Sequence, residues 1–254
     1  MPSRTWGQMR CADLCSEISS RFSPETAIRA QRRLARMAVV SDQYSTIRVV
    51  VGLDASYRRG LGETGLGVAV ALRYPSMRVL ACSAVARRIC IPYVPGLLAF
   101  REMAVMVPAL LGLGVKPDLI VVDGHGIAHP RRAGIATHVG VVFDVPSIGV
   151  AKRRLYGEER TISGTKYLVD KDGTLLAGIL DRGRSRIYVS PGHRLSVETS
   201  MQLVKKMIRR GRLPEPTRIA DHISKTIKNN IPSDIGCDVV RIPCSGNSSR
   251  NTLS

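Results

Sequence analysis

Apolar side chains recur at helical spacing in four segments of the chain. In the first, ETAIRAQRRLARMAVV, Ser23 is suited to cap the helix and Pro24 to occupy its first position. In the second segment, Pro108 predicts a kink, because proline removes one hydrogen bond of the helix. The spacing predicts helices over Pro24–Val40, Leu97–Leu113, Ile135–Phe143 and Leu195–Arg210.

Short β-branched runs, bounded by Gly, Pro, Asp and Ser, predict the strands. The first three and an intervening turn over Arg58–Gly65 suit an antiparallel meander, and later strands alternate with helices. The expected strands are Ile47–Tyr57, Gly67–Tyr74, Met77–Ala86, Pro117–Gly124, PSIGVAK ending at Lys152, and the pair TLLAGIL and RIYVS.

This order of elements predicts an α/β fold, in which helices cover a mixed sheet. We expect one domain over residues 1–254, with its core at about 45–225. Beyond about Lys228 the chain is rich in Asn and Ser and loses its periodicity, so residues 229–254 are expected to form a flexible tail.

Composition narrows the classes of protein. The longest apolar stretch, Met103–Val115, is shorter than the roughly 20 residues of a membrane helix. The first residues contain no apolar segment of the kind that a secretory signal needs, so a cytoplasmic location is expected. The protein is also expected to be a monomer. The net charge of +18 is spread along the chain, and such a basic surface favours a nucleic-acid partner.

Six cysteines are unevenly spaced along the chain and form no CxxC pair. Neither a zinc ribbon nor a redox dithiol is indicated, and Cys11 and Cys15 lack a nearby histidine that would complete a metal site. We therefore expect the cysteines to be reduced thiols, most of them buried.

Carboxylates at the ends of two buried strands are the main chemical signal. Asp is disfavoured in strands and costly to bury, yet Asp54 and Asp123 end two of them. If these strands are neighbours, the two like charges need a cation, and magnesium prefers such ligands. Glu102, on the helix between the strands, is a candidate third ligand, and Lys152 at another strand end is suited to neutralise a phosphate.

Two loops add weaker signals. In DGHGIAHPRR, His125 and His129 lie four residues apart, but the glycines and Pro130 make a helical zinc motif improbable, so contact of His129 with a phosphate or a coordinated water fits better. In PYVPG, Tyr93 stands between two prolines, and such a stiff aromatic can act as a wedge in a duplex. An ordinary surface tyrosine is the alternative.

Several long motifs, in one order, resemble the endonuclease V family of deoxyinosine 3′ endonucleases, which has a ribonuclease H-like fold. The resemblance extends from about Val49 to Asp221. The N-terminal cysteine pair and the residues after Asp221 match nothing in the family pattern. The motifs are GLDASY, the Pro-Ser pair before the third strand, PYVPGLLAFRE, PDLIVVDGHGIAHPRRAGIATHVGVVFDVPSIGVAK, YVSPGHRLSVETS and RLPEPTRIAD.

The resemblance implies a role for each matching residue. The magnesium-binding aspartates would be Asp54 and Asp123, and manganese is expected to substitute for magnesium. The other catalytic residues would be Glu102, Lys152 and Asp221. The substrate-contacting residues would be the wedge Tyr93, the backbone of Gly96, Leu98 and Gly124 at the hypoxanthine, and His129 near the nucleic acid.

The resemblance implies that the protein acts in DNA repair by hydrolysing the second phosphodiester bond 3′ to deoxyinosine, leaving 3′-hydroxyl and 5′-phosphate ends. Two alternatives remain open on the sequence. One keeps the chemistry but acts on inosine-containing RNA, and the other is a non-catalytic module that grips nucleic acid by its basic face. The second alternative explains the charge but not the carboxylates at the strand ends.

Overall fold

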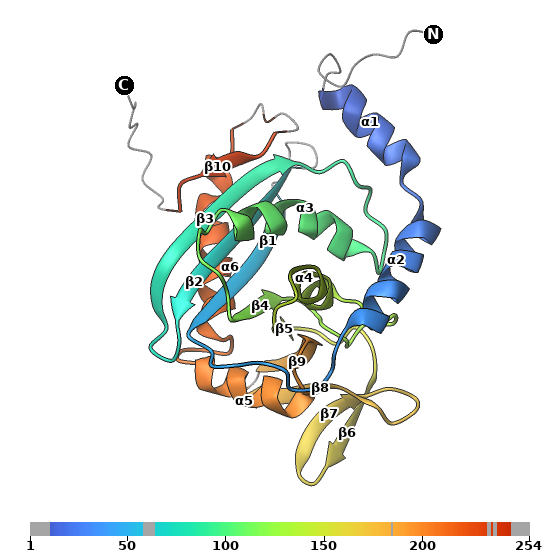
Figure 1. Cartoon of the computed structure of the whole chain (residues 1–254), viewed down its shortest axis with the longest axis vertical. Coiled ribbons are helices and arrows are strands. Elements are labelled where there is room, and N and C mark those ends of the chain that lie inside the picture. Colours follow the sequence, from blue (N-terminus) through green and yellow to red (C-terminus); the bar gives the residue numbers. More distant parts are fainter. Residues whose placement is uncertain (1–10, 58–63, 184, 233–234, 236–237, 245–254) are drawn as a thin grey trace.

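One mixed sheet, with helices on both of its faces, organises the described part of the chain (Figure 1). The computed structural model describes residues 11–57, 64–183, 185–232, 235 and 238–244. The α/β class that the sequence predicts, a mixed sheet flanked by helices, is confirmed. The single-domain boundaries, the cytoplasmic location and the monomeric state stay predictions.

The strand order in the sheet is β10-β3-β2-β1-β4-β5-β9-β8-β7-β6. The pairs β1–β4 and β4–β5 are parallel, and the other neighbouring pairs are antiparallel. The strands are β1 Val49–Tyr57, β2 Thr64–Arg73, β3 Arg78–Arg88, β4 Leu119–Asp123, β5 Ser147–Ala151, β6 Glu158–Ile162, β7 Thr165–Val169, β8 Leu175–Arg182, β9 Ser185–His193 and β10 Val240–Ile242.

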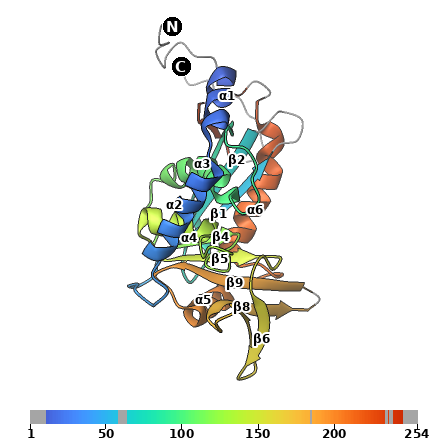
Figure 2. The ribbon, with the colours of Figure 1, turned by 90° about the vertical axis from the view of Figure 1, so that its right-hand side faces the viewer.

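The helices pack in two layers. Residues of α3 and α4 fill the core on one face of the sheet, and residues of α5 and α6 fill the core on the other. Helix α2 packs against α4, on the side of the molecule that faces the viewer in Figure 2. The helices are α1 Cys11–Arg21, α2 Pro24–Met37, α3 Leu98–Leu111, α4 Ile135–Phe143, α5 Val197–Met207, α6 Glu215–Ile227 and the short 3-10 helix η2 Lys228–Asn230.

Local signals explain why these elements begin where they do. The predicted cap of α2 is confirmed, because the Ser23 hydroxyl accepts a hydrogen bond from the Thr26 amide at 3.2 Å. Pro108 lies inside α3, as expected. Strand β1 is buried over most of its length, as its continuous apolar run predicts for a central strand. The expected turn over residues 58–65 falls mainly outside the described residues, and Thr64 and Gly65 begin β2.

A close contact between β1 and α6 fixes the geometry of the site. A Cβ atom added at Gly52 would stand 2.1 Å from the carbonyl oxygen of Pro216, so only glycine permits this approach. Because α6 therefore lies directly on β1, Asp221 of α6 is brought beside the end of that strand.

The prediction of a flexible tail from about residue 229 is wrong for the residues that the structure describes. Ile231, Ile235 and Ile242 are buried, and β10 pairs with the edge strand β3. The reason is that a few isolated apolar side chains and a three-residue strand need no sequence periodicity, only a surface to pack on. Residues 245–254 lie outside the described part.

The expectation of reduced cysteines is also wrong. Cys15 is bonded to Cys90, Cys82 is bonded to Cys244, and no described cysteine is free. The partners are 75 and 162 residues apart in the sequence, so spacing could not show which residues the fold brings together. These two bonds attach the N-terminal helix α1 and the segment after β10 to the region of β3.

Candidate active site

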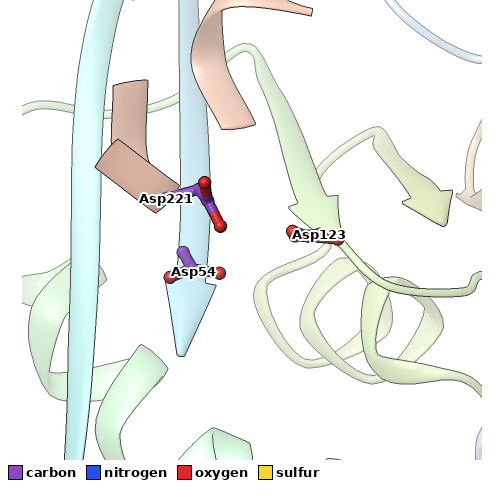
Figure 3. A group of neighbouring side chains, drawn as sticks. All are labelled: Asp54, Asp123 and Asp221. Carbon is purple, nitrogen blue, oxygen red and sulfur yellow. The ribbon is translucent and has the colours of Figure 1, made fainter. Parts of the chain in front are cut away.

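Three carboxylates meet where two parallel strands end. Asp54 lies near the end of β1, Asp123 ends β4, and Asp221 projects toward them from α6 (Figure 3). One oxygen atom of each carboxylate lies within 4.8 Å of the others. The neighbouring strands that the sequence analysis required for Asp54 and Asp123 are present, because β1 pairs with β4. Three carboxylate oxygens at this spacing are a donor set that suits a hard divalent cation.

The electrostatics of this cluster favour a bound cation. Burial, followed by the nearby Asp123 carboxylate, raises the pKa of Asp54 to about 7. Burial, followed by Asp54 and Asp123, raises the pKa of Glu102 to about 8. Glu102 is not a member of the three-carboxylate group, so within the described residues Asp221, rather than Glu102, supplies the third potential ligand.

Lys152 places a positive charge next to Asp123 and Asp221. Its Nζ atom lies 2.5 Å from Asp123 Oδ2 and 3.6 Å from Asp221 Oδ1, just beyond the end of β5. Although burial lowers the pKa of Lys152, its hydrogen bond to Asp123 and the nearby carboxylates raise it above the usual value. The amine is therefore protonated at neutral pH and keeps its charge beside the carboxylates.

A cavity of about 210 Å³ opens beside the acidic cluster. It is lined by all five residues that the sequence analysis assigned to the substrate: Tyr93, Gly96, Leu98, Gly124 and His129. Glu102 and Asp123 line the same cavity, so the predicted base-binding residues and the acidic cluster share one space. Tyr93 is 63% exposed at this cavity, and its ring is therefore accessible to a large partner.

His129 has a different environment from the one that its motif suggested. Its side chain is buried, its Nε2 atom is 3.2 Å from the carbonyl oxygen of Gly96, and its Nδ1 atom accepts from the Arg131 amide. Burial, followed by Arg131, lowers the pKa of His129 to about 4, so the ring is neutral. A hydrogen bond from His129 to a phosphate or a coordinated water would require one of these contacts to break.

Sequence reasoning missed one residue of this cavity. Gln31 of α2 is fully buried in the wall and contacts Gly96. An isolated glutamine among arginines on a helix gives no signal in the sequence, although the strong amphipathic pattern of α2 showed that one of its faces is buried.

Strand-end carboxylates, a lysine charge and an adjoining cavity are features that a nuclease site can use, and the carboxylates could hold a metal ion. The sequence model of the family described as endonuclease V matches residues 32–222. The endonuclease V of Aeropyrum pernix is 46% identical over 216 residues, which are 85% of this chain and 84% of that protein. The chain therefore belongs to the endonuclease V family, and it is a hydrolase of nucleic acids.

Solved structures agree with this assignment. The crystal structure of the endonuclease V from Streptomyces avermitilis matches with a TM-score of 0.75 and 30% identity, over 82% of this chain and 94% of that chain. The Ciona intestinalis endonuclease V, solved in complex with a 23mer DNA containing an inosine followed by a ribo-adenosine, matches with a TM-score of 0.72 and 26% identity. That match covers 83% of this chain and all of the Ciona chain.

Among the described residues, no helix combines the length and the apolar character that crossing a bilayer requires.

Proposed function

We propose that this protein hydrolyses DNA at deoxyinosine, cutting the second phosphodiester bond 3′ to the lesion and leaving 3′-hydroxyl and 5′-phosphate ends. The observation that carries the proposal is the shared cavity, which Gly96 and Gly124 line together with Glu102 and Asp123. A base held there would lie beside the acidic cluster, which is the arrangement that a lesion-directed nuclease needs. The inosine-containing DNA bound by the Ciona relative supports this substrate.

Magnesium is the proposed cofactor, with manganese able to replace it. Asp54, Asp123 and Asp221 would hold the ion, and their fit rests on the grouped oxygens and on the raised pKa of Asp54. When bound, the ion supplies charge stabilisation for the phosphate and the leaving oxygen. The sequence-based expectation of two aspartate ligands is thereby extended to a third.

The other side chains hold charge and protons around the scissile phosphate. Lys152, protonated beside Asp123, would neutralise charge that develops on the phosphate oxygens. Glu102, with its pKa near 8 in the cavity, can gain or lose a proton near neutral pH, which suits it to accept the proton of the attacking water. Each of these groups comes from a different element, so the fold rather than one motif assembles them.

The cavity lining would recognise the base. The first amides of α3 have no partner within the helix, and Leu98 begins that helix beside the cavity. A Cβ atom added at Gly124 would lie 2.5 Å from the side chain of Ile135, which also lines the cavity, so this part of the wall has no room for a larger residue. Tyr93 would fill the space that the extracted base leaves in the duplex.

The test is single-turnover cleavage of a labelled inosine strand by the wild type and by Asp123→Asn. We expect the variant to bind the strand but to cut it slower by at least on the order of 10²–10³, because the cluster loses a charge that the transition state needs. Asp172→Asn, which changes an exposed carboxylate in the turn between β7 and β8, is the control and should cut normally.

Three results would contradict the proposal. Asp123→Asn could cut at the wild-type rate, the wild type could shift the strand without cutting it in magnesium, or a matched inosine RNA could be cut in preference to DNA. The second result would favour the binding module, and the third would favour the ribonuclease.

A further inference from the structure

Gln31 is a polar side chain with no exposed surface in the wall of the base cavity. Its Nε2 atom donates to the Gly96 carbonyl at 2.9 Å and lies 3.4 Å from the Ala133 carbonyl oxygen. Its Oε1 atom accepts from Arg131 Nε at 2.5 Å. Burying an amide is costly unless it is hydrogen-bonded, and all of these contacts lead to residues of the cavity or its rim. Helix α2 is therefore attached to the cavity by a specific polar contact.

The carbonyl of Gly96 is the point at which these contacts converge. Besides the hydrogen bond from Gln31, it accepts one from Arg131 Nη2 at 2.7 Å and lies 3.2 Å from His129 Nε2. Gly96 has a φ of +77°, in the left-handed region, and an added Cβ atom would stand 2.7 Å from Arg131 Nη2. A carbonyl with three protein partners has no lone pair left for a ligand. A bound base would consequently meet the amide groups of this loop rather than this oxygen.

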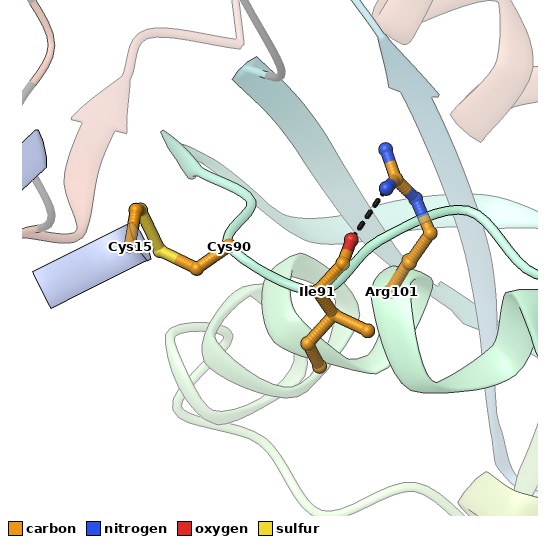
Figure 4. The surroundings of a disulfide bond; sticks show 4 residues. All are labelled: Cys15, Cys90, Ile91 and Arg101. Carbon is orange, nitrogen blue, oxygen red and sulfur yellow. Dashed lines mark hydrogen bonds between the residues drawn. A yellow bond between two sulfur atoms is a disulfide. The ribbon is translucent and has the colours of Figure 1, made fainter. Parts of the chain in front are cut away.

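The start of the same loop is also held. Cys90 is bonded to Cys15 of α1, and Arg101 of α3 donates to the carbonyl of Ile91 (Figure 4). The loop from residue 90 to residue 96 is thus fixed at both ends, with the exposed Tyr93 between them. One anchor at each end comes from an N-terminal helix: Cys15 from α1 and Gln31 from α2.

We propose that Gln31 is a positioning residue for base recognition, which sets the conformation of the loop carrying Tyr93 and Gly96 through its hydrogen bond to the Gly96 carbonyl. The inference rests on the proposed function and adds to it a residue that immediately precedes the family match at residue 32. Its side chain touches the cavity wall but takes no part in the chemistry, so it should govern which base is accepted and how tightly.

The substitution that isolates this role is Gln31→Glu. Glutamate has nearly the same shape and keeps the acceptor for Arg131, but when ionised it has no donor for Gly96. Gln31→Ala removes all three hydrogen bonds of the side chain. The control is Gln202→Glu, the same chemical change at an exposed position of α5.

Cleavage of inosine strands and of matched adenosine strands is measured for all four proteins. We expect Gln31→Glu to raise KM for the inosine strand about tenfold, the effect of one lost buried hydrogen bond, with kcat changed less than about threefold. Gln31→Ala should raise KM at least as much, because it also loses the bond to Arg131. The preference for inosine over adenosine should narrow by a similar factor. Gln202→Glu should match the wild type.

Amide hydrogen exchange gives a readout that does not depend on activity. In Gln31→Glu, peptides covering residues 91–97 should exchange faster while peptides from β4 and β5 are unchanged. If the wild type cuts no inosine strand, the proposed function fails, and the exchange measurement still tests Gln31. The inference is overturned if Gln31→Glu keeps the wild-type KM and the wild-type preference for inosine. It is also overturned if this variant cuts the inosine and adenosine strands less by the same factor while peptides covering residues 91–97 exchange as in the wild type.

Discussion

Replacing Asp54 by asparagine should stabilise the metal-free protein while abolishing cleavage. The carboxylate is 8% exposed and shares its site with Asp123 and Asp221, so its charge has little water and two like neighbours. Asparagine has the same shape without the charge. The variant therefore removes an electrostatic penalty that the folded protein carries for the sake of cation binding.

The size and the pH dependence of this gain in stability follow from the pKa of Asp54. A rise from 3.8 to about 7 means that the folded state holds the proton more tightly than the unfolded state. The stability of the wild type should fall as the pH rises through this window and should level off above pH 7. At about 1.4 kcal/mol per pKa unit, the ionised Asp54 costs at most about 4 kcal/mol. The gain from Asp54→Asn should thus be near zero at pH 4 and largest at pH 8.

Urea unfolding with a chelator present, at pH 4.5, 6 and 8, measures this gain. Magnesium at saturating concentration should stabilise the wild type more than the variant, because binding to the folded state alone adds stability. Asp172→Asn should show neither the gain in stability nor the weaker response to magnesium. A variant that is less stable than the wild type at pH 8 without metal, or a gain that does not change with pH, would refute the reasoning.

Three further predictions concern the loop, the helix contact and a disulfide. Tyr93→Ala should slow single-turnover cleavage of an inosine duplex more than that of the same single strand, since a wedge offsets the cost of extracting a paired base; equal losses would argue for a surface tyrosine. Gly52→Ala should lower the free energy of unfolding by about 1–3 kcal/mol in urea titrations, because its Cβ atom meets the Pro216 carbonyl, and normal stability would show that α6 can shift freely. Cys82→Ser should lower the free energy of unfolding by about 2–5 kcal/mol in the same assay, because it removes the bond to Cys244. The difference between the two proteins should vanish in reductant, which opens this bond in the wild type.

Strand-end chemistry made part of the site visible in the sequence. Asp54 and Asp123 stand out because a carboxylate at the end of a buried apolar run needs a partner. Asp221 was assigned only through the resemblance to the family, and the helix α6 that carries it was not among the predicted elements. The signal for that helix was present: Pro216 lies in its first turn, and Ile219, Ile223 and Ile227 recur at intervals of four.

Other features leave no signal in the sequence. Strand β6 is exposed along its whole length, so the alternation that marks a half-buried strand is absent. The disulfide partners are far apart in the chain, and the three contacts of the Gly96 carbonyl join residues from separate segments. Features of this kind depend on tertiary placement alone, which periodicity and motif spacing do not encode.

The bonds Cys15–Cys90 and Cys82–Cys244 also close covalent rings that contain the active-site residues. Residues 102, 123, 152 and 221 all lie within the ring that Cys82–Cys244 closes, and Asp54 lies within the ring that Cys15–Cys90 closes. A protease that cuts the exposed turn at Ser163 and Gly164 would therefore leave two pieces of chain that remain one molecule. Until the bond is reduced, the piece that carries Asp54 and Asp123 stays linked to the piece that carries Asp221.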